Sequence, residues 1–127
     1  MQKNQSSRSI GDIGEAAVCD LLRRNGYETV KRNFTVRGGE IDIIARKNDT
    51  LAFVEVKTRS EGSLQEAELA VNEYKRQHII RTAEMYIGKN PWAEQYNCRF
   101  DVAAVTLENG RVKSLRYYAG AFDASKK

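Results

Sequence analysis

The sequence predicts an α/β protein in which a mixed β-sheet of about five strands is flanked by helices. Three features carry this prediction: stretches with the period of an amphipathic helix near residues 12–24 and 69–87, stretches rich in β-branched residues between and after them, and an Asn109-Gly110 hairpin turn. In chain order these features read α-β-β-β-α-β-β. Strands and helices that alternate in this way favour a sheet covered by helices rather than a helical bundle.

The chain is 127 residues long, which is enough for one domain with a hydrophobic core but not for two domains. We expect a disordered N-terminal tail over residues 1–9, a single domain over residues 10–120 and a C-terminal tail over residues 121–127. No repeat, linker or low-complexity tract divides the chain.

The first helix is predicted to begin at Asp12 and to end at Asn25-Gly26, a pair typical of a helix C-terminus. Its apolar stripe consists of Ile13, Ala17 and Leu21. Asp12 is followed three residues later by Glu15, which matches the capping-box pattern at a helix start. Capping is therefore one role open to Glu15.

The next three stretches read as strands, over residues 27–36, 38–46 and 51–59. Asn48 and Asp49 tolerate the left-handed backbone of a tight turn, so the second and third strands form a β-hairpin centred on these two residues. This turn sets the register of every pair along the hairpin.

The predicted register gives the hairpin one apolar face and one mixed face. The apolar face consists of Ile41, Ile43, Ala45, Ala52, Val54 and Val56. On the other face, Asp42 is opposite Glu55 and Glu40 is opposite Lys57. Like charges that face each other across a hairpin are destabilising, so the Asp42–Glu55 pair needs an explanation.

The C-terminal half is predicted to contain a polar loop over residues 60–68, a helix from Leu69 to Ile87, a buried strand from Cys98 to Leu107 and a last strand from Arg111 to Tyr118. The core stripe expected for the helix consists of Val71, Tyr74, Ile79, Ala83 and Tyr86 or Ile87. Asp101 and Arg99 are expected to form a structural ion pair.

A divalent cation would remove the repulsion between Asp42 and Glu55. Mg²⁺ commonly binds one or two carboxylates and completes its octahedron with water and phosphate oxygens. Lys57 lies two residues beyond Glu55, on the same face of the strand and about 7 Å away. This position suits a cation that faces a phosphate or an attacking water.

The Asp42…Glu55-x-Lys57 arrangement resembles the PD-(D/E)xK nuclease superfamily, and more closely the YraN-like family of predicted bacterial endonucleases, which is related to archaeal Holliday junction resolvases. The resemblance covers most of the chain, through Gly11-Asp12-Ile13-Gly14-Glu15-Ala16-Ala17, Gly26-Tyr27, Arg32-Asn33-Phe34, the segments 38–45 and 53–59, Ala70-Val71 with Lys75, and Arg99-Phe100-Asp101-Val102. The proline of the superfamily's name has no counterpart before Asp42, and the only proline is Pro91.

This resemblance implies a restriction-endonuclease-like core and metal-assisted hydrolysis of phosphodiester bonds. It implies that Asp42, Glu55 and the backbone carbonyl of Val56 hold Mg²⁺ or Mn²⁺, and that Lys57 orients the attacking water or stabilises developing charge. Glu15 matches the family's N-terminal acid and could complete the metal shell, directly or through water. Glu40 would support the site by pairing with Lys57.

Basic and polar side chains around the hairpin are candidate contacts for nucleic-acid phosphates. They are Arg32, Arg37, Lys47, Thr58, Arg59 and, by the resemblance, Lys75. The net charge of +4 is compatible with such a partner without demanding one. We expect DNA, structured or branched, and junction cleavage would suit a two-fold homodimer.

Two other classes of function remain open at this point. One is a nucleic-acid-binding module without catalysis, and the other is a protein-interaction domain whose charges form a solvated face. No segment is long and apolar enough for a membrane span, and the N-terminus lacks an apolar signal stretch, so we expect a cytoplasmic protein without a membrane partner.

Overall fold

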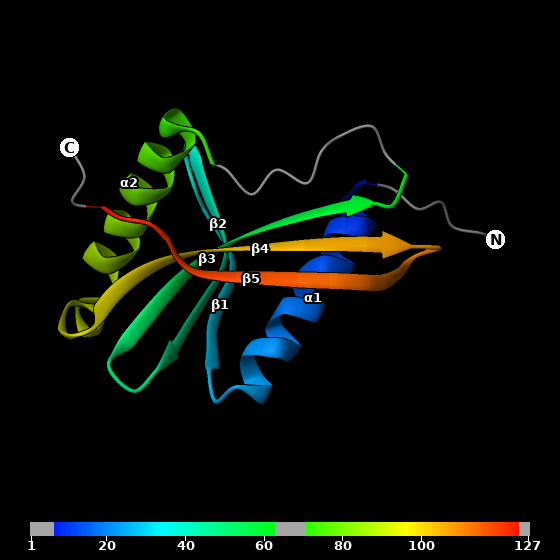
Figure 1. The fold of residues 1–127 in the computed structure, drawn as a ribbon. Helices are drawn as coiled ribbons and strands as arrows, with labels where there is room; N and C mark the ends of the chain where they lie inside the picture. The colour runs from blue at the N-terminus through cyan, green and yellow to red at the C-terminus, as the bar shows by residue number, and fades with distance from the viewer. Residues whose placement is uncertain (1–6, 63–70, 125–127) are drawn as a thin grey trace.

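The computed structural model describes residues 7–62 and 71–124, and its elements follow the predicted order. The elements are α1 (Ser7–Arg24), β1 (Glu28–Val36), β2 (Gly39–Lys47), β3 (Thr50–Ser60), α2 (Glu73–Lys89), a short 3₁₀ helix (Pro91–Gln95), β4 (Asn97–Glu108) and β5 (Arg111–Phe122). The predicted α/β class with a mixed five-stranded sheet is confirmed (Figure 1).

The strands lie in the sheet in their chain order, β1-β2-β3-β4-β5. All neighbouring pairs are antiparallel except β3 and β4, which are parallel because the chain crosses the sheet through α2 between them. Parallel neighbours need such a crossover, whereas the antiparallel pairs here are joined by tight turns.

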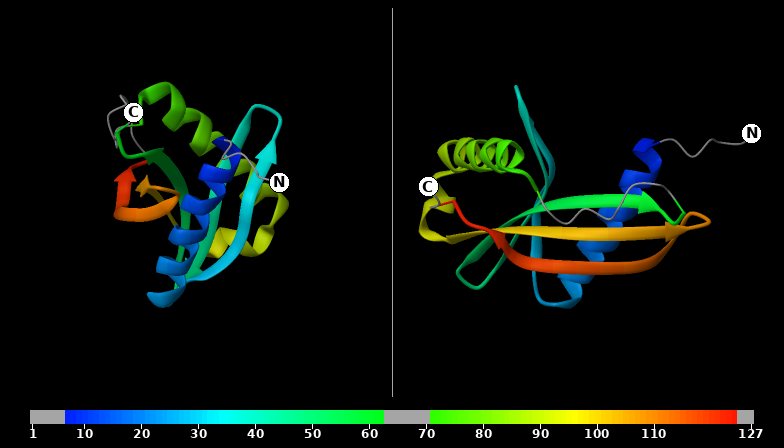
Figure 2. Two further views of the ribbon diagram at one scale, coloured as in Figure 1. Left: turned by 90° about the vertical axis from the view of Figure 1, so that its right-hand side faces the viewer. Right: turned by 45° about the horizontal axis from the view of Figure 1, so that its top comes forward.

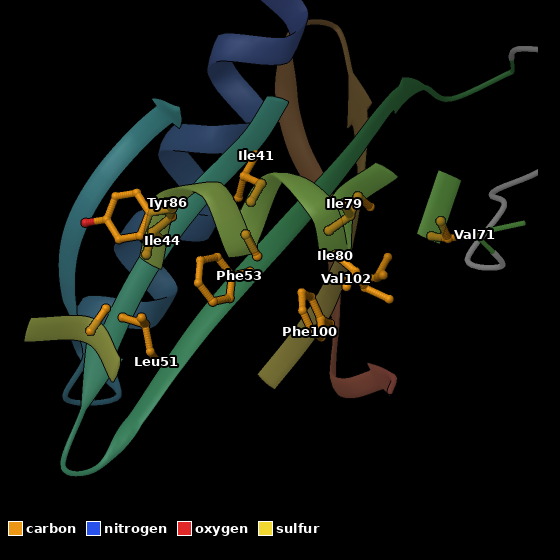
Figure 3. Close-up of a cluster of buried hydrophobic side chains, with 12 residues drawn as sticks. Ile41, Ile44, Leu51, Phe53, Val71, Ile79, Ile80, Tyr86, Phe100 and Val102 are labelled. Atoms are coloured by element: carbon orange, nitrogen blue, oxygen red, sulfur yellow. The ribbon is translucent and has the colours of Figure 1, made fainter. Parts of the chain in front are cut away.

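The two helices lie on opposite faces of the sheet, and each covers its own core (Figures 1 and 2). The α1 side buries Val18 and Leu22 against Ile43, Ala52 and Val54. The α2 side buries a larger cluster with several aromatic rings, shown in Figure 3. This cluster includes Ile44, Phe53, Ile79, Ile80, Tyr86 and Phe100.

The hairpin register is confirmed from Lys47–Thr50 to Ile43–Val54, and the recorded β2–β3 pairing ends there. Beyond Ile43 the β2 strand stays paired with β1 but bends away from β3 (Figures 1 and 2), and Asp42 and Asn33 lie between the Arg32–Ile43 and Phe34–Ile41 pairs. Asn33 has a φ of 53°, in the left-handed region that asparagine tolerates better than most residues. The bend carries the tip of the β1–β2 hairpin away from β3.

This bend makes one part of the predicted hairpin pattern wrong. Ile41 was expected beside Ile43 on the same face, but it packs with Ile44 and Phe53 on the α2 side (Figure 3). Strict alternation of side chains holds only while a strand remains straight and paired on both sides. The bend at Asp42 ends that regularity, and Glu40 pairs with Thr35 of β1 instead of facing Lys57.

Three predicted element ends differ from the structure by more than two residues. Helix α1 begins at Ser7 rather than Asp12, because a helix can run through polar residues ahead of its apolar stripe. Helix α2 begins at Glu73, where the side chain of Asn72 caps it by accepting a hydrogen bond from the Lys75 amide. Strand β5 continues to Phe122, so residues 121 and 122 belong to the sheet. Of the expected tails and loop, residues 1–6, 63–70 and 125–127 lie outside the described part of the chain.

Glycines allow both helices to approach the hairpin closely. A Cβ atom on Gly14 of α1 would lie 1.9 Å from Thr58 Oγ1 on β3, and one on Gly39 of β2 would lie 2.0 Å from Thr82 Oγ1 on α2. Both contacts are far inside van der Waals distance. Because Gly14 and Gly39 have no side chains, α1 and α2 can lie this close to the strands that carry the acidic residues.

Candidate functional site

A hollow of about 340 Å³ opens where the bend of β2 meets the N-terminal half of α2. Its lining combines acidic, basic and aromatic side chains from three elements. The lining residues are Gly38, Gly39, Glu40, Asp42, Glu55, Tyr74, Lys75, His78 and Ile79. Asp42 and Glu55 thus both line this hollow, although the predicted direct pairing of Asp42 with Glu55 lies beyond the end of the β2–β3 ladder.

The side chain of Asp42 replaces the backbone hydrogen bonds that β2 and β3 no longer form beyond Ile43–Val54. Its Oδ2 atom accepts a hydrogen bond of 2.8 Å from the backbone N–H of Val56. The carboxylate therefore joins the end of β2 to β3 where the backbone of β2 has turned away. The Val56 side chain lies on the opposite face, against the α1 core.

The pKa of Asp42 is raised from 3.8 to about 7, and burial is the largest cause. The negative charge of Glu55 is the next upward contribution, the hydrogen bond from Val56 opposes it, and Glu15 and Glu40 add smaller upward contributions. The charges of Glu55, Glu15 and Glu40 therefore disfavour the ionised form of Asp42. A bound cation would reverse this balance by stabilising the ionised carboxylate.

Glu55 is paired with Lys75 across the hollow. Lys75 Nζ lies 3.1 Å from Glu55 Oε2, and the side chains are 51% and 12% exposed, respectively. The pair links the middle of β3 to the first turn of α2. Lys75 therefore lies at the acidic residues, where its ammonium group can also meet an anion that enters the hollow.

Glu15 reaches the same region from α1. Its Oε1 atom lies 3.4 Å from Arg32 Nη2 on β1, and its charge contributes to the raised pKa of Asp42. Because α1 begins at Ser7, Glu15 lies inside the helix and the expected capping box does not form. Capping is thus excluded as its role, which leaves the contact with Arg32 and the proximity to Asp42.

Near the end of β3, successive side chains point to opposite faces of the sheet. These are the side chains of Lys57, Thr58 and Arg59. Thr58 faces α1, where its buried Oγ1 atom lies against Gly14 and has no hydrogen-bond partner among the described residues. Lys57 and Arg59 are half-buried and, by the alternation of the strand, share the face of Glu55. Contact of Thr58 with a phosphate stays a prediction, and the geometry favours Lys57 and Arg59 for that role.

The remaining predicted contacts lie at the two ends of β2. Arg37 is exposed in the β1–β2 turn, next to Gly38 of the hollow. Lys47 lies at the other end, where Nζ donates to the Asn25 carbonyl at 2.8 Å and sits 5.4 Å from the Tyr27 ring centre. Lys47 thus holds the end of α1, and its contact with nucleic acid stays a prediction.

Sequence reasoning missed two residues of the hollow, Tyr74 and His78. Tyr74 was predicted to belong to the α2 core but is 75% exposed, and its ring centre lies 4.4 Å from that of His78. The hydrophobic period alone could not exclude it from the core, because Tyr74 lies at the helix start, where the sheet no longer covers it. The pairing of His78 with an aromatic residue four positions earlier was the available signal.

The donors present fit a hard divalent cation, which prefers carboxylate and carbonyl oxygens. Asp42 and Glu55 supply two carboxylates that repel each other, and both face the hollow. Among the described residues, no group of three or more histidine, cysteine or acidic side chains forms a complete metal site. A cation here would take its other ligands from backbone carbonyl groups, water or a substrate.

Arg99 and Asp101 form the predicted ion pair, away from this hollow. Asp101 is fully buried and accepts hydrogen bonds from Arg99, from the Tyr117 hydroxyl and from the Gly120 amide.

No helix in the described part of the chain is long and apolar enough to cross a membrane.

Fold and site together define an α/β protein with a pair of acidic residues in a hollow at the bend of a mixed sheet. The chain belongs to the UPF0102 family, described as an uncharacterised protein family, whose pattern matches residues 14–105. This is the YraN-like family that the motifs predict. The matched region contains the hairpin, the hollow and most of α1.

Relatives from several organisms match most of the chain. A UPF0102 protein of Trichlorobacter lovleyi is 39% identical over 120 residues, which are 94% of both chains. One from Alkaliphilus oremlandii is 43% identical over 108 residues, covering 84% of this chain and 92% of the relative. One from Pseudomonas aeruginosa is 36% identical over 126 residues, covering 98% and 100%.

Proposed function

We propose that this protein is a metal-dependent endonuclease that hydrolyses phosphodiester bonds in structured or branched DNA. The observation that carries the proposal is the shared hollow of Asp42 and Glu55, in which burial and like charge hold the pKa of Asp42 near 7. A fold tolerates such a costly arrangement more readily where the site binds a cation. Lys75 supplies positive charge in the hollow, and Lys57 lies two residues beyond Glu55 on the same face of β3.

Asp42 and Glu55, with the Val56 carbonyl, would hold Mg²⁺ or Mn²⁺. A cation held there would supply Lewis-acid chemistry to a phosphoryl oxygen and to a water. Lys57 then orients that water or stabilises charge that develops on the phosphate. Lys75 can move from Glu55 to a phosphate oxygen, because more than half of its side chain is exposed.

Glu15 and Arg32 form the side of the site that belongs to α1 and β1. Arg32 keeps Glu15 in place at 3.4 Å, and Glu15 can accept a hydrogen bond from a water bound near Asp42. A role through water suits this geometry, because Arg32 already occupies one oxygen of the carboxylate.

The test is a cleavage panel over branched, duplex and single-stranded substrates in Mg²⁺, Mn²⁺ and EDTA. We expect wild type to cleave only with metal, and Lys57→Ala to lose most single-turnover cleavage while Mn²⁺ binding by calorimetry stays nearly unchanged. Asp42→Asn should lose most of both, because a neutral amide oxygen is a much weaker ligand for a hard cation than a carboxylate.

Asp49→Asn is the matched control, since Asp49 is an exposed acid of the same hairpin, in its turn. It should cleave and bind Mn²⁺ like wild type. Lys57→Arg should not restore activity, because a planar guanidinium has a different donor geometry from an ammonium. Nucleic-acid binding without metal-dependent cleavage of any substrate would leave the binding module as the function.

A further inference from the structure

We propose that Tyr74, supported by His78, is a stacking platform for one unpaired nucleobase beside the acidic hollow. This inference rests on the proposed nuclease function and narrows its substrate to nucleic acid with an unstacked base near the cleaved bond. It assigns a ligand to two residues that the mechanism above does not use.

The exposure of Tyr74 is the first observation. Among the exposed large apolar side chains of the described residues, Tyr74 has 75% of its surface accessible, whereas Met85, Val112 and Tyr118 have 37–42%. A single exposed apolar residue is ordinary on a protein surface, so exposure alone carries no argument. The position of Tyr74 does carry the argument, because Tyr74 lines the same hollow as Asp42 and Glu55.

The second observation is that the Tyr74 ring is supported by His78 and by an anchored turn of α2. His78 lies one helical turn later, with its ring centre 4.4 Å from that of Tyr74. The backbone below is held by the Asn72 cap on the Lys75 amide and by a 2.6 Å hydrogen bond from Arg76 Nε to the Val71 carbonyl. Ile79 and Ile80 anchor the same turn in the core. An aromatic ring on a helical turn held in this way loses less conformational entropy when a ligand stacks on it than a ring on a loop would.

The third observation is the charge around the platform. Lys75 follows Tyr74 directly and reaches Glu55, and Arg37 lies exposed beside Gly38 on the other rim. A flat apolar ring next to cations matches a nucleotide, which offers a base face and a phosphate a few ångströms apart. Nucleobases stack on aromatic side chains with little dependence on sequence.

Base pairs inside an intact duplex already stack on both faces, so they cannot also cover Tyr74. A bulged, flipped or single-stranded base can. The platform therefore predicts a preference for substrates that contain an unpaired base, which is common to junctions, flaps and single strands. It does not require a particular base.

The test measures binding in EDTA, so that it does not depend on cleavage. Two duplexes labelled with fluorescein are compared by anisotropy at low salt, one with a single unpaired adenine and one with an abasic site at that position. We expect wild type to bind the adenine duplex roughly 5- to 150-fold more tightly, the size of measured base–aromatic stacking effects. Tyr74→Ala should bind both duplexes with the affinity of the abasic one.

Tyr74→Phe keeps the ring and should keep the preference. Tyr118→Ala is the matched control, because it removes another exposed tyrosine, on β5 and outside the hollow, and it should also keep the preference. Thermal melting of Tyr74→Ala should stay close to wild type, since the side chain is mostly exposed.

The proposal is overturned if wild type does not distinguish adenine from the abasic site, if neither duplex binds, or if Tyr74→Ala discriminates as well as wild type. Metal-dependent cleavage without discrimination would reject the platform and keep the nuclease. Discrimination without any cleavage would keep the platform and reject the nuclease.

Discussion

At the scale of single residues, Asp42 shows how a fold sets the chemistry of one carboxyl group. It is needed in the structure as an acceptor for Val56 N–H, yet burial and the charges of Glu55, Glu15 and Glu40 oppose its ionisation. The free energy of unfolding should therefore depend on pH through this group.

We predict that Asp42→Asn is more stable than metal-free wild type at pH 8. The folded pKa of about 7 lies above the unfolded value of 3.8, so wild type loses stability as pH rises between these values and keeps that penalty above pH 7. Asparagine avoids the penalty and can still accept from Val56. We expect a gain on the order of 2 kcal/mol at pH 8 that disappears near pH 4. Thermal melting from pH 4 to 8 in EDTA measures it, and a gain that does not change with pH would disprove the raised pKa.

Lys75 allows metal binding and catalysis to be separated. Its ammonium must be displaced from Glu55, or share it, when a cation binds. We predict that Lys75→Ala binds Mn²⁺ up to about 5-fold more tightly, the range of partly exposed ion pairs, yet cleaves more slowly because a phosphate contact is lost. Calorimetry and single-turnover cleavage provide the two measurements. Lys89→Ala, which removes an exposed lysine at the far end of α2, serves as the control. Weaker Mn²⁺ binding by Lys75→Ala would contradict the proposed competition.

At the scale of elements, the distance between α1 and β3 depends on the absence of a side chain at Gly14. We predict that Gly14→Ala destabilises the protein, although alanine favours helix, because its Cβ would overlap Thr58 Oγ1. Gly11→Ala lies in the same helix with nothing within 4 Å of the added Cβ, and it should gain up to about 1 kcal/mol from helix propensity. Urea unfolding compares the two variants. Equal effects of both changes would show that α1 does not press on Thr58.

The same contact predicts a rescue. Thr58→Ala shortens the side chain that meets the new methyl group, so Gly14→Ala combined with Thr58→Ala should recover much of the stability lost by Gly14→Ala alone. Thr58 Oγ1 is buried without a partner among the described residues, so its removal costs no hydrogen bond there. Unfolding of the double variant, read as a double-mutant cycle, should give a favourable coupling. Strict additivity would place the strain of Gly14→Ala elsewhere.

The β4–β5 pair depends on a buried acid. Asp101 accepts from Arg99 Nε at 2.9 Å, from Tyr117 Oη at 2.5 Å and from Gly120 N at 2.9 Å. Its removal should cost roughly 3–5 kcal/mol, because a charged and a polar partner lose their acceptor inside the protein. Glu28→Ala breaks the exposed pair with Arg46 and should cost less than about 1 kcal/mol. Chemical denaturation of Asp101→Ala and Glu28→Ala tests the contrast, and similar losses would refute it.

At the scale of the whole molecule, the net charge of +4 should make nucleic-acid affinity depend on salt more than on sequence. Arg37→Ala, at the rim of the hollow, should weaken binding to all sequences and reduce the salt slope by about one. Arg111→Ala, at the turn that begins β5, is the control and should change neither. Anisotropy titrations at several salt concentrations measure both quantities. A flat salt response with strong sequence preference would point to base readout instead.

The sequence by itself determines the features that depend on neighbouring residues. The Asn48-Asp49 turn sets the register up to Ile43–Val54, and with it the order of the first strands and the presence of Asp42 and Glu55 at one site. Tight turns and alternating side chains are local, so they can be read from spacing. The family motifs identify the same residues.

Only the tertiary structure decides where β2 leaves β3, which face Ile41 takes, and which side chains meet the acids from elsewhere in the chain. Lys75, Tyr74 and His78 line the hollow because α2 packs on one face of the sheet, and α1 on the other face brings Glu15 close enough to raise the pKa of Asp42. Such contacts depend on close approaches such as that of Gly14 to Thr58, which no periodic pattern records. The exposure of Tyr74 follows from where the sheet stops covering α2, and this is a property of the whole fold.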